Sequence, residues 1–439
     1  MTVLDLTLVP HASGIAAGPD GTMDILVRVR APAQPAGAPV AAPRNLALVI
    51  DRSGSMEGQP LQEAKRCLTQ IVDQLPAADQ VSLVAYGHHA ALLSPLVPAS
   101  QKDGLKLQIA VIAAGGGTAL YDGWHMGATS LSTLAGSGAL ARVLLLSDGN
   151  ANRGLTSKDA LAAACARLAA EGITTSTYGL GREFNEELMS RMAEAGQGTA
   201  YYGETAEDLI DPMQQELDLL SALCARRLRM TFEGLSGVTA TLLNRYPVID
   251  GRHVLPDIAW ASDATAIIRL HIPEAARGAA PGGTLPVLKV DLTYEPMDGA
   301  KHSQVCARLD LEVLGAAEAE ALVADPEVSR RVMELAIAEL QFAARHAAGL
   351  RDWDRVRRLL DDAQRLARDN PWALSAIAVL EQLARRRDAD GFSKEAYYRS
   401  QRMNARLSAS DEVSVWNEAS ERLRKSYHRR KPQEGKRFD

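Results

Sequence analysis

The stretch Leu46-Ala47-Leu48-Val49-Ile50-Asp51-Arg52-Ser53-Gly54-Ser55 decides the fold of this 439-residue chain. Its first five residues are apolar and rich in β-forming types, and the run is too short for a core helix, which predicts a buried parallel strand. Asp51 then stands at the carboxyl end of that strand, and the hydroxyls of Ser53 and Ser55 follow it. Oxygen donors on one tight, glycine-containing loop suit Mg²⁺. Ligands of open α/β sheets bind outside the carboxyl ends of the strands, so the position of the loop agrees with its chemistry.

The pattern Asp-x-Ser-x-Ser over residues 51–55 resembles the metal-ion-dependent adhesion site of the von Willebrand factor A family. That family adds a distant Thr and a distant Asp, and the chain offers a candidate for each. Thr118 follows Gly115-Gly116-Gly117 in a loop that leads into a predicted helix, and Asp148 follows the strand-like run Val143–Leu146. The resemblance implies that Ser53, Ser55 and Thr118 bind the ion directly, while Asp51 and Asp148 bind it directly or through water.

The resemblance also implies a function. The expected cofactor is Mg²⁺, with Mn²⁺ or Ca²⁺ as alternatives, and one coordination position stays open for an Asp or Glu carboxylate of a partner protein. The chain is similar to the bacterial intracellular branch of the family, whose members often work beside an AAA+ ATPase or within kinase/phosphatase modules. We therefore expect a non-enzymatic, metal-dependent protein-binding module that acts as an adaptor or regulatory subunit.

Other functions remain as alternatives. A Mg²⁺-dependent phosphoryl hydrolase of the haloacid-dehalogenase type also places an Asp after its first strand, but it uses Asp-x-Asp, and Ser53 occupies the second acidic position here. The chain has no Gly-x-x-x-x-Gly-Lys-Ser/Thr motif to cradle a nucleotide. A structural scaffold with a vestigial metal site is the third alternative. His88 and His89 are candidate extra ligands that would select Mn²⁺ or Zn²⁺, although paired loop histidines are more often surface residues.

The chain from about residue 44 to 222 alternates strand-like and helix-like segments, which is typical of a Rossmann-like, mostly parallel sheet flanked by helices. The predicted strands are Asn45–Ile50, Val81–Tyr86, Arg142–Ser147, Thr174–Gly179 and Thr199–Tyr202. The predicted helices are Gln59–Gln74, Asp122–Leu134, Ser157–Ala170, Asn185–Glu194 and Ala206–Leu223.

The flanking segments predict other structures. Segments in which apolar and polar residues alternate lie before and after the α/β block, and they predict a β-sandwich into which that block is inserted. Beyond residue 316, apolar residues at helical spacing predict helices. The expected domains are residues 1–43 (sandwich strands and linker), 44–224 (von Willebrand factor A domain), 225–315 (β-sandwich), 316–425 (helical region) and 426–439 (basic, partly disordered tail).

Composition excludes several other classes. The formal net charge of −6 gives no overall attraction to nucleic acid or acidic membranes. No apolar stretch reaches the length of a membrane span, and the first residues lack the features of a signal peptide, so we expect a cytoplasmic protein. The four scattered cysteines form no Cys-x-x-Cys pair and therefore indicate neither a zinc knuckle nor a redox pair.

Overall fold

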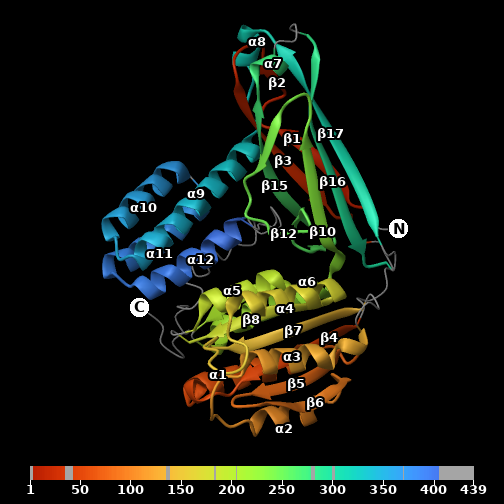
Figure 1. Ribbon diagram of the computed structural model, residues 1–439, viewed down its shortest axis with the longest axis vertical. Helices are drawn as coiled ribbons and strands as arrows, with labels where there is room; N and C mark the ends of the chain where they lie inside the picture. The colour runs from red at the N-terminus through yellow and green to blue at the C-terminus, as the bar shows by residue number, and fades with distance from the viewer. Residues whose placement is uncertain are drawn as a thin grey trace, which may run out of the picture. The chain divides into compact units, whose positions relative to one another are not determined.

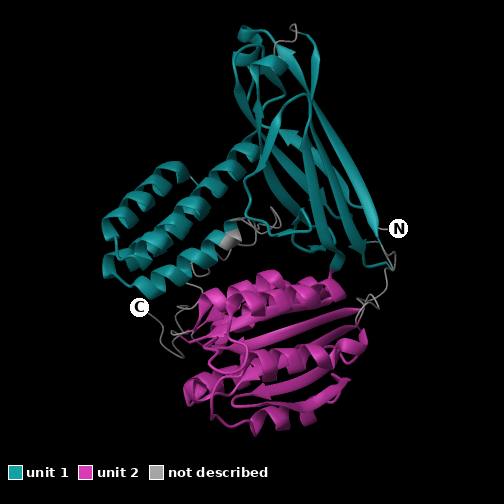
Figure 2. Cartoon of the chain, in the orientation of Figure 1, with its two compact units in different colours: residues 1–38, 223–419 teal, residues 39–222, 420–439 magenta. Residues whose placement is uncertain are grey.

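The structure is a computed structural model that describes residues 3–34, 43–134, 139–181, 184–203, 205–277, 282–298, 302–368 and 370–404. The chain divides into two compact units, unit 1 (residues 1–38 and 223–419) and unit 2 (residues 39–222 and 420–439) (Figure 2). The predicted basic tail, 426–439, lies outside the described residues. None of the helices in the described part of the chain combines the length and the apolarity needed to cross a bilayer.

Unit 2 is built on a six-stranded sheet in the order β6-β5-β4-β7-β8-β9 (Figure 1). Its strands are β4 (Arg44–Asp51), β5 (Gln80–Tyr86), β6 (Ala90–Pro98), β7 (Leu140–Ser147), β8 (Ile173–Leu180) and β9 (Gln197–Gly203). All neighbours pair in parallel except β6, which is antiparallel to β5. The predicted parallel sheet is confirmed. Edge strand β6 was not predicted. Pro95 and Pro98 interrupt it, and its exposed and half-buried residues form neither an apolar run nor a clean alternation.

Helices cover both faces of this sheet. They are α1 (Gln59–Gln74), α2 (Lys102–Ala110), α3 (Leu120–Ser130), α4 (Lys158–Glu171), α5 (Glu186–Ala195) and α6 (Ala206–Ser221), with short 3-10 turns η1 (Gly54–Met56) and η2 (Ser132–Leu134). Helices α3, α4 and α5 share one core with odd-numbered strand residues such as Val49 and Val143. Glu216 of α6 binds the even-numbered Arg142 of β7, so α6 covers the opposite face. Among the α-helices described for unit 2, α2 is the one that the sequence did not predict.

Two glycines let α3 lie directly on the sheet. A Cβ at Gly123 would lie 2.3 Å from Cδ1 of Tyr86, and a Cβ at Gly127 would lie 2.4 Å from Cγ2 of Val49. Both neighbours are fully buried, so neither can move away without disturbing the core. The close approach of α3 therefore holds the Tyr86 ring in place at the end of β5.

We expect Gly123→Ala to lower the unfolding free energy of unit 2 by about 1–3 kcal/mol through this clash, although Ala is the better helix former. The matched control is Gly104→Ala in α2, where a Cβ meets no atom within 4 Å. That change is expected to raise stability by about 0.5–1 kcal/mol. Denaturant-dependent hydrogen exchange of unit 2 amides measures both values, and equal effects of the two substitutions would refute the packing argument.

Unit 1 contains two sheets that share a core. The first has the order β1-β3-β15-β11 and the second β12-β13-β10-β16-β17-β2, with β14 paired to β10. Their strands are β1 (Asp5–Pro10), β2 (Gly14–Ala16), β3 (Gly21–Arg30), β10 (Leu223–Gly234), β11 (Thr239–Leu242), β12 (Val248–Ile249), β13 (Arg252–Val254), β14 (Ile258–Ala259), β15 (Asp263–Ile272), β16 (Thr284–Pro296) and β17 (Ser303–Leu314). Strand β3 pairs with β15 over its whole length, so segments from before and after unit 2 in the sequence form one sheet.

The alternation of side chains along β3 explains how unit 1 is layered. Ile25, Val27 and Val29 face the core between the sheets, whereas Leu26 packs with Val328 and Leu335 of α9 on the other face. The helices of unit 1 are α7 (Glu274–Arg277), α8 (Ala316–Glu320), α9 (Pro326–Gly349), α10 (Trp353–Ala367), α11 (Pro371–Arg386) and α12 (Ala389–Asn404). Helices α9 to α12 share a separate apolar core, which confirms the predicted C-terminal helices. The sequence indicated three of these four long helices and missed α12.

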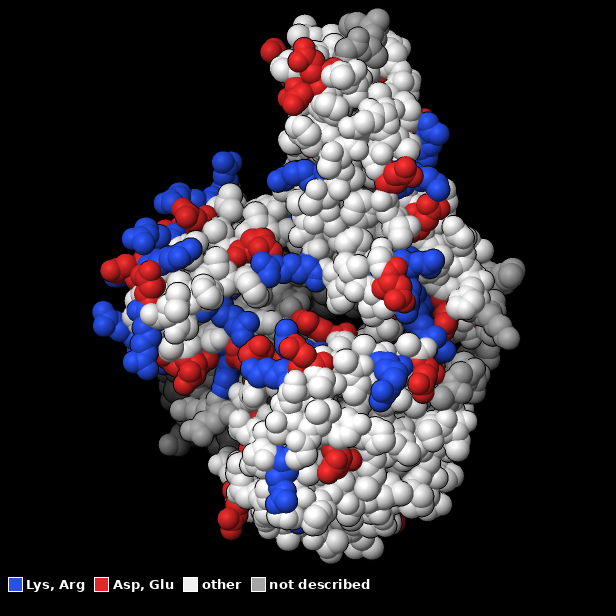
Figure 3. Space-filling view, in the orientation of Figure 1, with Lys and Arg blue, Asp and Glu red and all other residues white. Residues whose placement is uncertain are grey.

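The surface carries both signs of charge. On the face shown in Figure 3, basic and acidic side chains are interspersed over both units. The surface ion pairs of unit 1 include Arg269 with Asp24 and Arg245 with Glu339. Such exposed pairs contribute little to stability.

Candidate metal centre

Three neighbouring strands of unit 2 end at the same place and bring polar side chains together. Asp51, the last residue of β4, is in register with Tyr86, the last residue of β5. On the other side of β4, Ser147 ends β7 one residue beyond the Ile50–Leu146 pair. Asp51 therefore lies between a phenol and a hydroxyl at the carboxyl edge of the sheet, where the sequence placed it.

Both oxygens of the Asp51 carboxylate accept hydrogen bonds. Oδ1 accepts from the backbone N–H of Ser53 (2.8 Å), and Oδ2 accepts from the hydroxyls of Ser147 (2.7 Å) and Tyr86 (3.2 Å). Asp51 has no solvent exposure. Burial raises its pKa to about 6; hydrogen bonds from Ser53 and Ser147 oppose the rise, and the charge of Asp148 adds to it. The buried carboxylate is therefore held in one orientation, and no positive charge of the described residues is among the causes that shift its pKa.

The loop that carries Ser53 and Ser55 is joined to the glycine loop before Thr118. Gly54 N–H donates to Gly116 O (3.0 Å), and Gly115 N–H donates to Arg52 O (2.8 Å). Gly115 and Gly116 have φ values of +153° and +86°, which favour glycine. The hydroxyl oxygens of Ser53 and Ser55 lie 3.1 Å apart. Ser53 and Thr118 are buried, whereas Ser55 is exposed. The cluster of these three hydroxyl residues is therefore open to solvent on the Ser55 side.

The loop after β7 joins Asp148 to Thr118. Asn152 binds both backbone groups of Thr118: its Oδ1 accepts from Thr118 N–H (2.8 Å), and its own N–H donates to Thr118 O (3.2 Å). The carboxylate of Asp148 accepts from Asn150 N–H (3.0 Å), and only 7% of this residue is exposed. These contacts bring the loops that carry all five predicted ligands to one edge of the sheet: Asp51, Ser53, Ser55, Thr118 and Asp148.

The donor set fits a hard divalent cation. Two carboxylates and three hydroxyls offer only oxygen, which Mg²⁺, Mn²⁺ and Ca²⁺ prefer. A cation among them would neutralise the repulsion between Asp148 and Asp51 that helps to raise the pKa of Asp51. Within the described residues no group of three or more His, Cys, Asp or Glu is arranged to hold a metal, so soft or nitrogen-rich centres have no match there.

The alternative ligand His88 has another neighbour. Nη1 of Arg153 lies 2.6 Å from Nδ1 and 2.7 Å from Nε2 of its ring. Local desolvation, followed by the charges of Arg153 and His89, lowers the pKa of His88. The ring is thus neutral at pH 7, and its nitrogens face a guanidinium.

Three supporting residues escaped the sequence analysis: Tyr86, Ser147 and Asn152. A signal for two of them was present, because Tyr86 ends one predicted strand and Ser147 precedes Asp148 at the end of another. Asn152 lies in a loop of turn residues, 149–154, which the sequence indicates will border the metal site because it lies just beyond Asp148. Its contact with Thr118 spans 34 positions and was not predicted. Its role depends on the path of the loop after β7.

Comparisons with known proteins agree with this fold. The model of the von Willebrand factor type A domain matches residues 45–215. The uncharacterized protein sll0103 of Synechocystis sp. is 27% identical over 183 residues, which cover 41% of this chain and 42% of that protein. The chain thus spans less than half the length of this curated relative.

Two solved structures resemble most of the chain. A von Willebrand factor type A protein from Catenulispora acidiphila has a TM-score of 0.67 and 16% identity, covering 86% of this chain and 90% of that one. The ArnB paralog VWA2 from Sulfolobus acidocaldarius has a TM-score of 0.59 and 16% identity, covering 90% of this chain and 99% of that one. At such identities the likeness shows a common fold.

Proposed function

Because residues 45–215 belong to the von Willebrand factor type A domain family, we propose that this chain binds partner proteins through a divalent cation at the end of β4. Domains of this family often mediate protein–protein interactions, typically bind a divalent metal, and are generally not enzymes. The proposed ligands are Asp51, Ser53, Ser55, Thr118 and Asp148, and Mg²⁺ is the proposed ion, with Mn²⁺ or Ca²⁺ as alternatives.

The observation that carries the proposal is the buried Asp51 carboxylate beside two hydroxyls. Tyr86 and Ser147 orient this carboxylate, and outer partners of this kind typically change metal affinity 10–100-fold. Three of the five proposed ligands are neutral hydroxyls, so the protein offers only two negative charges. A bound Mg²⁺ would keep electrophilic character and offer a coordination position to an incoming carboxylate. The exposed Ser55 marks the side from which such a carboxylate reaches the site.

The proposed biological role is that of an adaptor or regulatory subunit in a bacterial protein assembly. Unit 2 would bind the acidic partner, and unit 1 would offer its sheets and helices to other components. An AAA+ ATPase or a kinase/phosphatase module is the proposed type of partner. We propose that the chain is divided into domains as follows. The metal-binding domain is residues 44–224, and it is inserted between the sandwich strands of 1–43 and 225–315. A helical region follows over 316–425.

Titration calorimetry of Mg²⁺ and Mn²⁺ into chelator-treated protein tests the proposal. Wild type is expected to bind one ion, and Asp51→Ala is expected to bind none, because the variant loses the carboxylate that anchors the donor set. Acetate is included in a parallel titration, since a carboxylate can complete the coordination shell. Wild type that binds neither ion, with or without acetate, would overturn the proposal. Equal binding by wild type and Asp51→Ala would show that the ion sits elsewhere.

A further inference from the structure

Arg153 is held at the rim of the proposed metal site by its backbone. Its N–H donates to Thr118 O (3.3 Å), beside the bond that Asn152 N–H makes to the same oxygen (3.2 Å). Its side chain runs over the glycine loop, because a Cβ at Gly117 would lie 2.7 Å from Cδ of Arg153. The position of Arg153 is therefore fixed relative to Thr118, a proposed ligand.

The guanidinium of Arg153 is also fixed at its far end. Nη1 contacts the ring of His88, which supplies no negative charge to neutralise it. Arg153 is exposed, and within the described part of the chain it forms no ion pair with a carboxylate. By contrast, two other exposed arginines of unit 2 are paired with carboxylates: Arg191 with Asp159 and Arg66 with Glu207. Arg153 thus presents a positioned and uncompensated positive charge to solvent.

Arg52 lies on a neighbouring loop but is directed differently. Its Nη1 donates to Ala113 O (3.4 Å), so its guanidinium turns toward the chain's own backbone. A partner that approaches the site from solvent therefore contacts the guanidinium of Arg153, whose position is fixed. A planar guanidinium is suited to bind a carboxylate through two parallel hydrogen bonds.

We propose that Arg153 binds a second carboxylate of the partner, so that the recognised segment is an acidic peptide with two Asp or Glu residues at a fixed spacing. This inference rests on the proposed function, in which the first carboxylate binds the metal. His88 acts as a brace that keeps the guanidinium in place without cancelling its charge. Two anchors at a fixed separation make the site selective for spacing as well as for charge.

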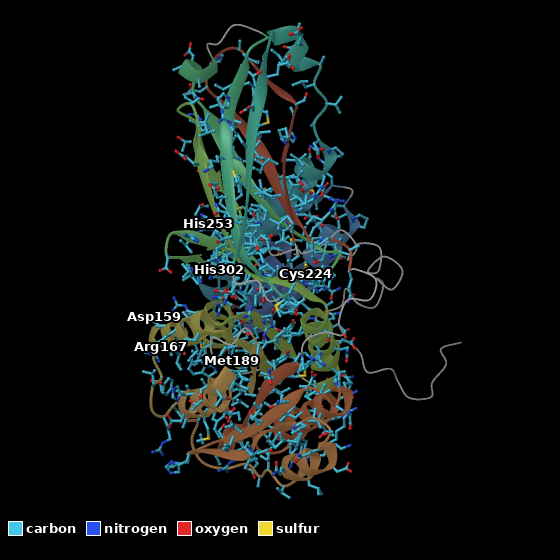
Figure 4. The ribbon with its side chains drawn as sticks, turned by 90° about the vertical axis from the view of Figure 1, so that its right-hand side faces the viewer. Asp159, Arg167, Met189, Cys224, His253 and His302 are labelled. Carbon is cyan, nitrogen blue, oxygen red and sulfur yellow. The ribbon has the colours of Figure 1, made fainter. Side chains whose placement is uncertain are left out.

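Selection of peptides from a random 12-residue library tests the inference. Wild type and Arg153→Glu are each used as bait in Mg²⁺, with Arg167→Glu as matched control. Arg167 is an exposed residue of α4, labelled in Figure 4, and its substitution changes the net charge by the same amount. Affinities of the selected peptides are then measured by fluorescence anisotropy in Mg²⁺ and in chelator.

Wild type is expected to select peptides with two acidic positions. Arg153→Glu is expected to weaken their binding about 10–100-fold and to prefer peptides with a basic residue at the second position, while Arg167→Glu stays within about twofold. Arg153→Gln, which keeps the length of the side chain, is expected to lie in between. Three outcomes would each overturn the inference. The selected peptides could share only one acidic position, Arg153→Glu and Arg167→Glu could lose the same affinity, or Mg²⁺-loaded wild type could select no acidic peptides. Calorimetry separates failure of this inference from failure of the proposed function. If the proposed function is wrong, wild type does not bind Mg²⁺.

Discussion

Asp51→Asn is expected to make the metal-free protein more stable at pH 7 and to abolish cation binding. The carboxylate is fully buried, and burial raises its pKa from an ordinary value of 3.8 to about 6. A shift of about two units corresponds to at most about 3 kcal/mol of unfavourable free energy for the ionised form. The neutral amide removes this cost, and its oxygen still accepts from Ser53 N–H. Thermal or denaturant unfolding in a chelating buffer measures the gain.

The pH dependence of this gain has a definite sign. Below about pH 3 the carboxyl is protonated in both the folded and the unfolded chain, so wild type and Asp51→Asn are expected to be about equally stable. Between about pH 4 and pH 6 the folded state of wild type binds more protons than the unfolded state, so its stability falls as the pH rises. Above pH 6 the difference between the two proteins is constant and largest.

Saturating Mg²⁺ is expected to reverse the order of stability. The ion binds only the folded wild type, which it stabilises by about 4.1 kcal/mol at a concentration about 1,000 times its dissociation constant. This exceeds the gain of at most about 3 kcal/mol from the substitution. Asp51→Asn gains nothing under the same conditions. An Asp51→Asn protein that is less stable than wild type in chelator at pH 7 would contradict the view that this carboxylate serves ligand binding rather than folding.

Glu216→Ala is expected to cause the largest loss of stability, about 3–5 kcal/mol in unit 2. Oε1 of Glu216 accepts from Nη1 of Arg142 (2.6 Å) and from Ser176, and Oε2 accepts from Tyr178 Oη (2.6 Å). Arg142 and Glu216 are both buried, so removal of the acid takes this carboxylate away from a buried positive charge. Hydrogen exchange of β7 and β8 amides in increasing denaturant measures the loss where it occurs.

Two further variants separate the buried charge from other effects of the change. Asp218→Ala removes an exposed carboxylate from the same helix and is expected to change stability by no more than about 0.5 kcal/mol. The double variant Arg142→Leu/Glu216→Leu removes both charges and is expected to be more stable than Glu216→Ala. If the double variant is as unstable as the single one, the loss of this carboxylate from the buried arginine is not the cause.

Much of unit 2 could be predicted because its information is local. An apolar run that ends in Asp51, and another that ends in Ser147-Asp148, each specify a buried strand and the polar residue at its end. Helix α1 begins and ends at the predicted residues, and Ser157 and Asn185 cap α4 and α5 through their side chains. The prediction was weakest at β6 and α2, where exposed residues blur the periodic pattern.

The sequence by itself determined the type of sheet and the five candidate ligands, which are Asp51, Ser53, Ser55, Thr118 and Asp148. It also associated Asp51 and Asp148 with the ends of two strands. Only the tertiary structure decided which side chains support them. The strand order β6-β5-β4-β7-β8-β9 places β4 between β5 and β7, and this brings Tyr86 and Ser147 onto the Asp51 carboxylate. Likewise, the pairing of Arg142 with Glu216 joins positions 74 residues apart. Local patterns specify each strand, but neighbours in a sheet depend on how the whole chain buries its apolar faces, and no short stretch of sequence contains that information.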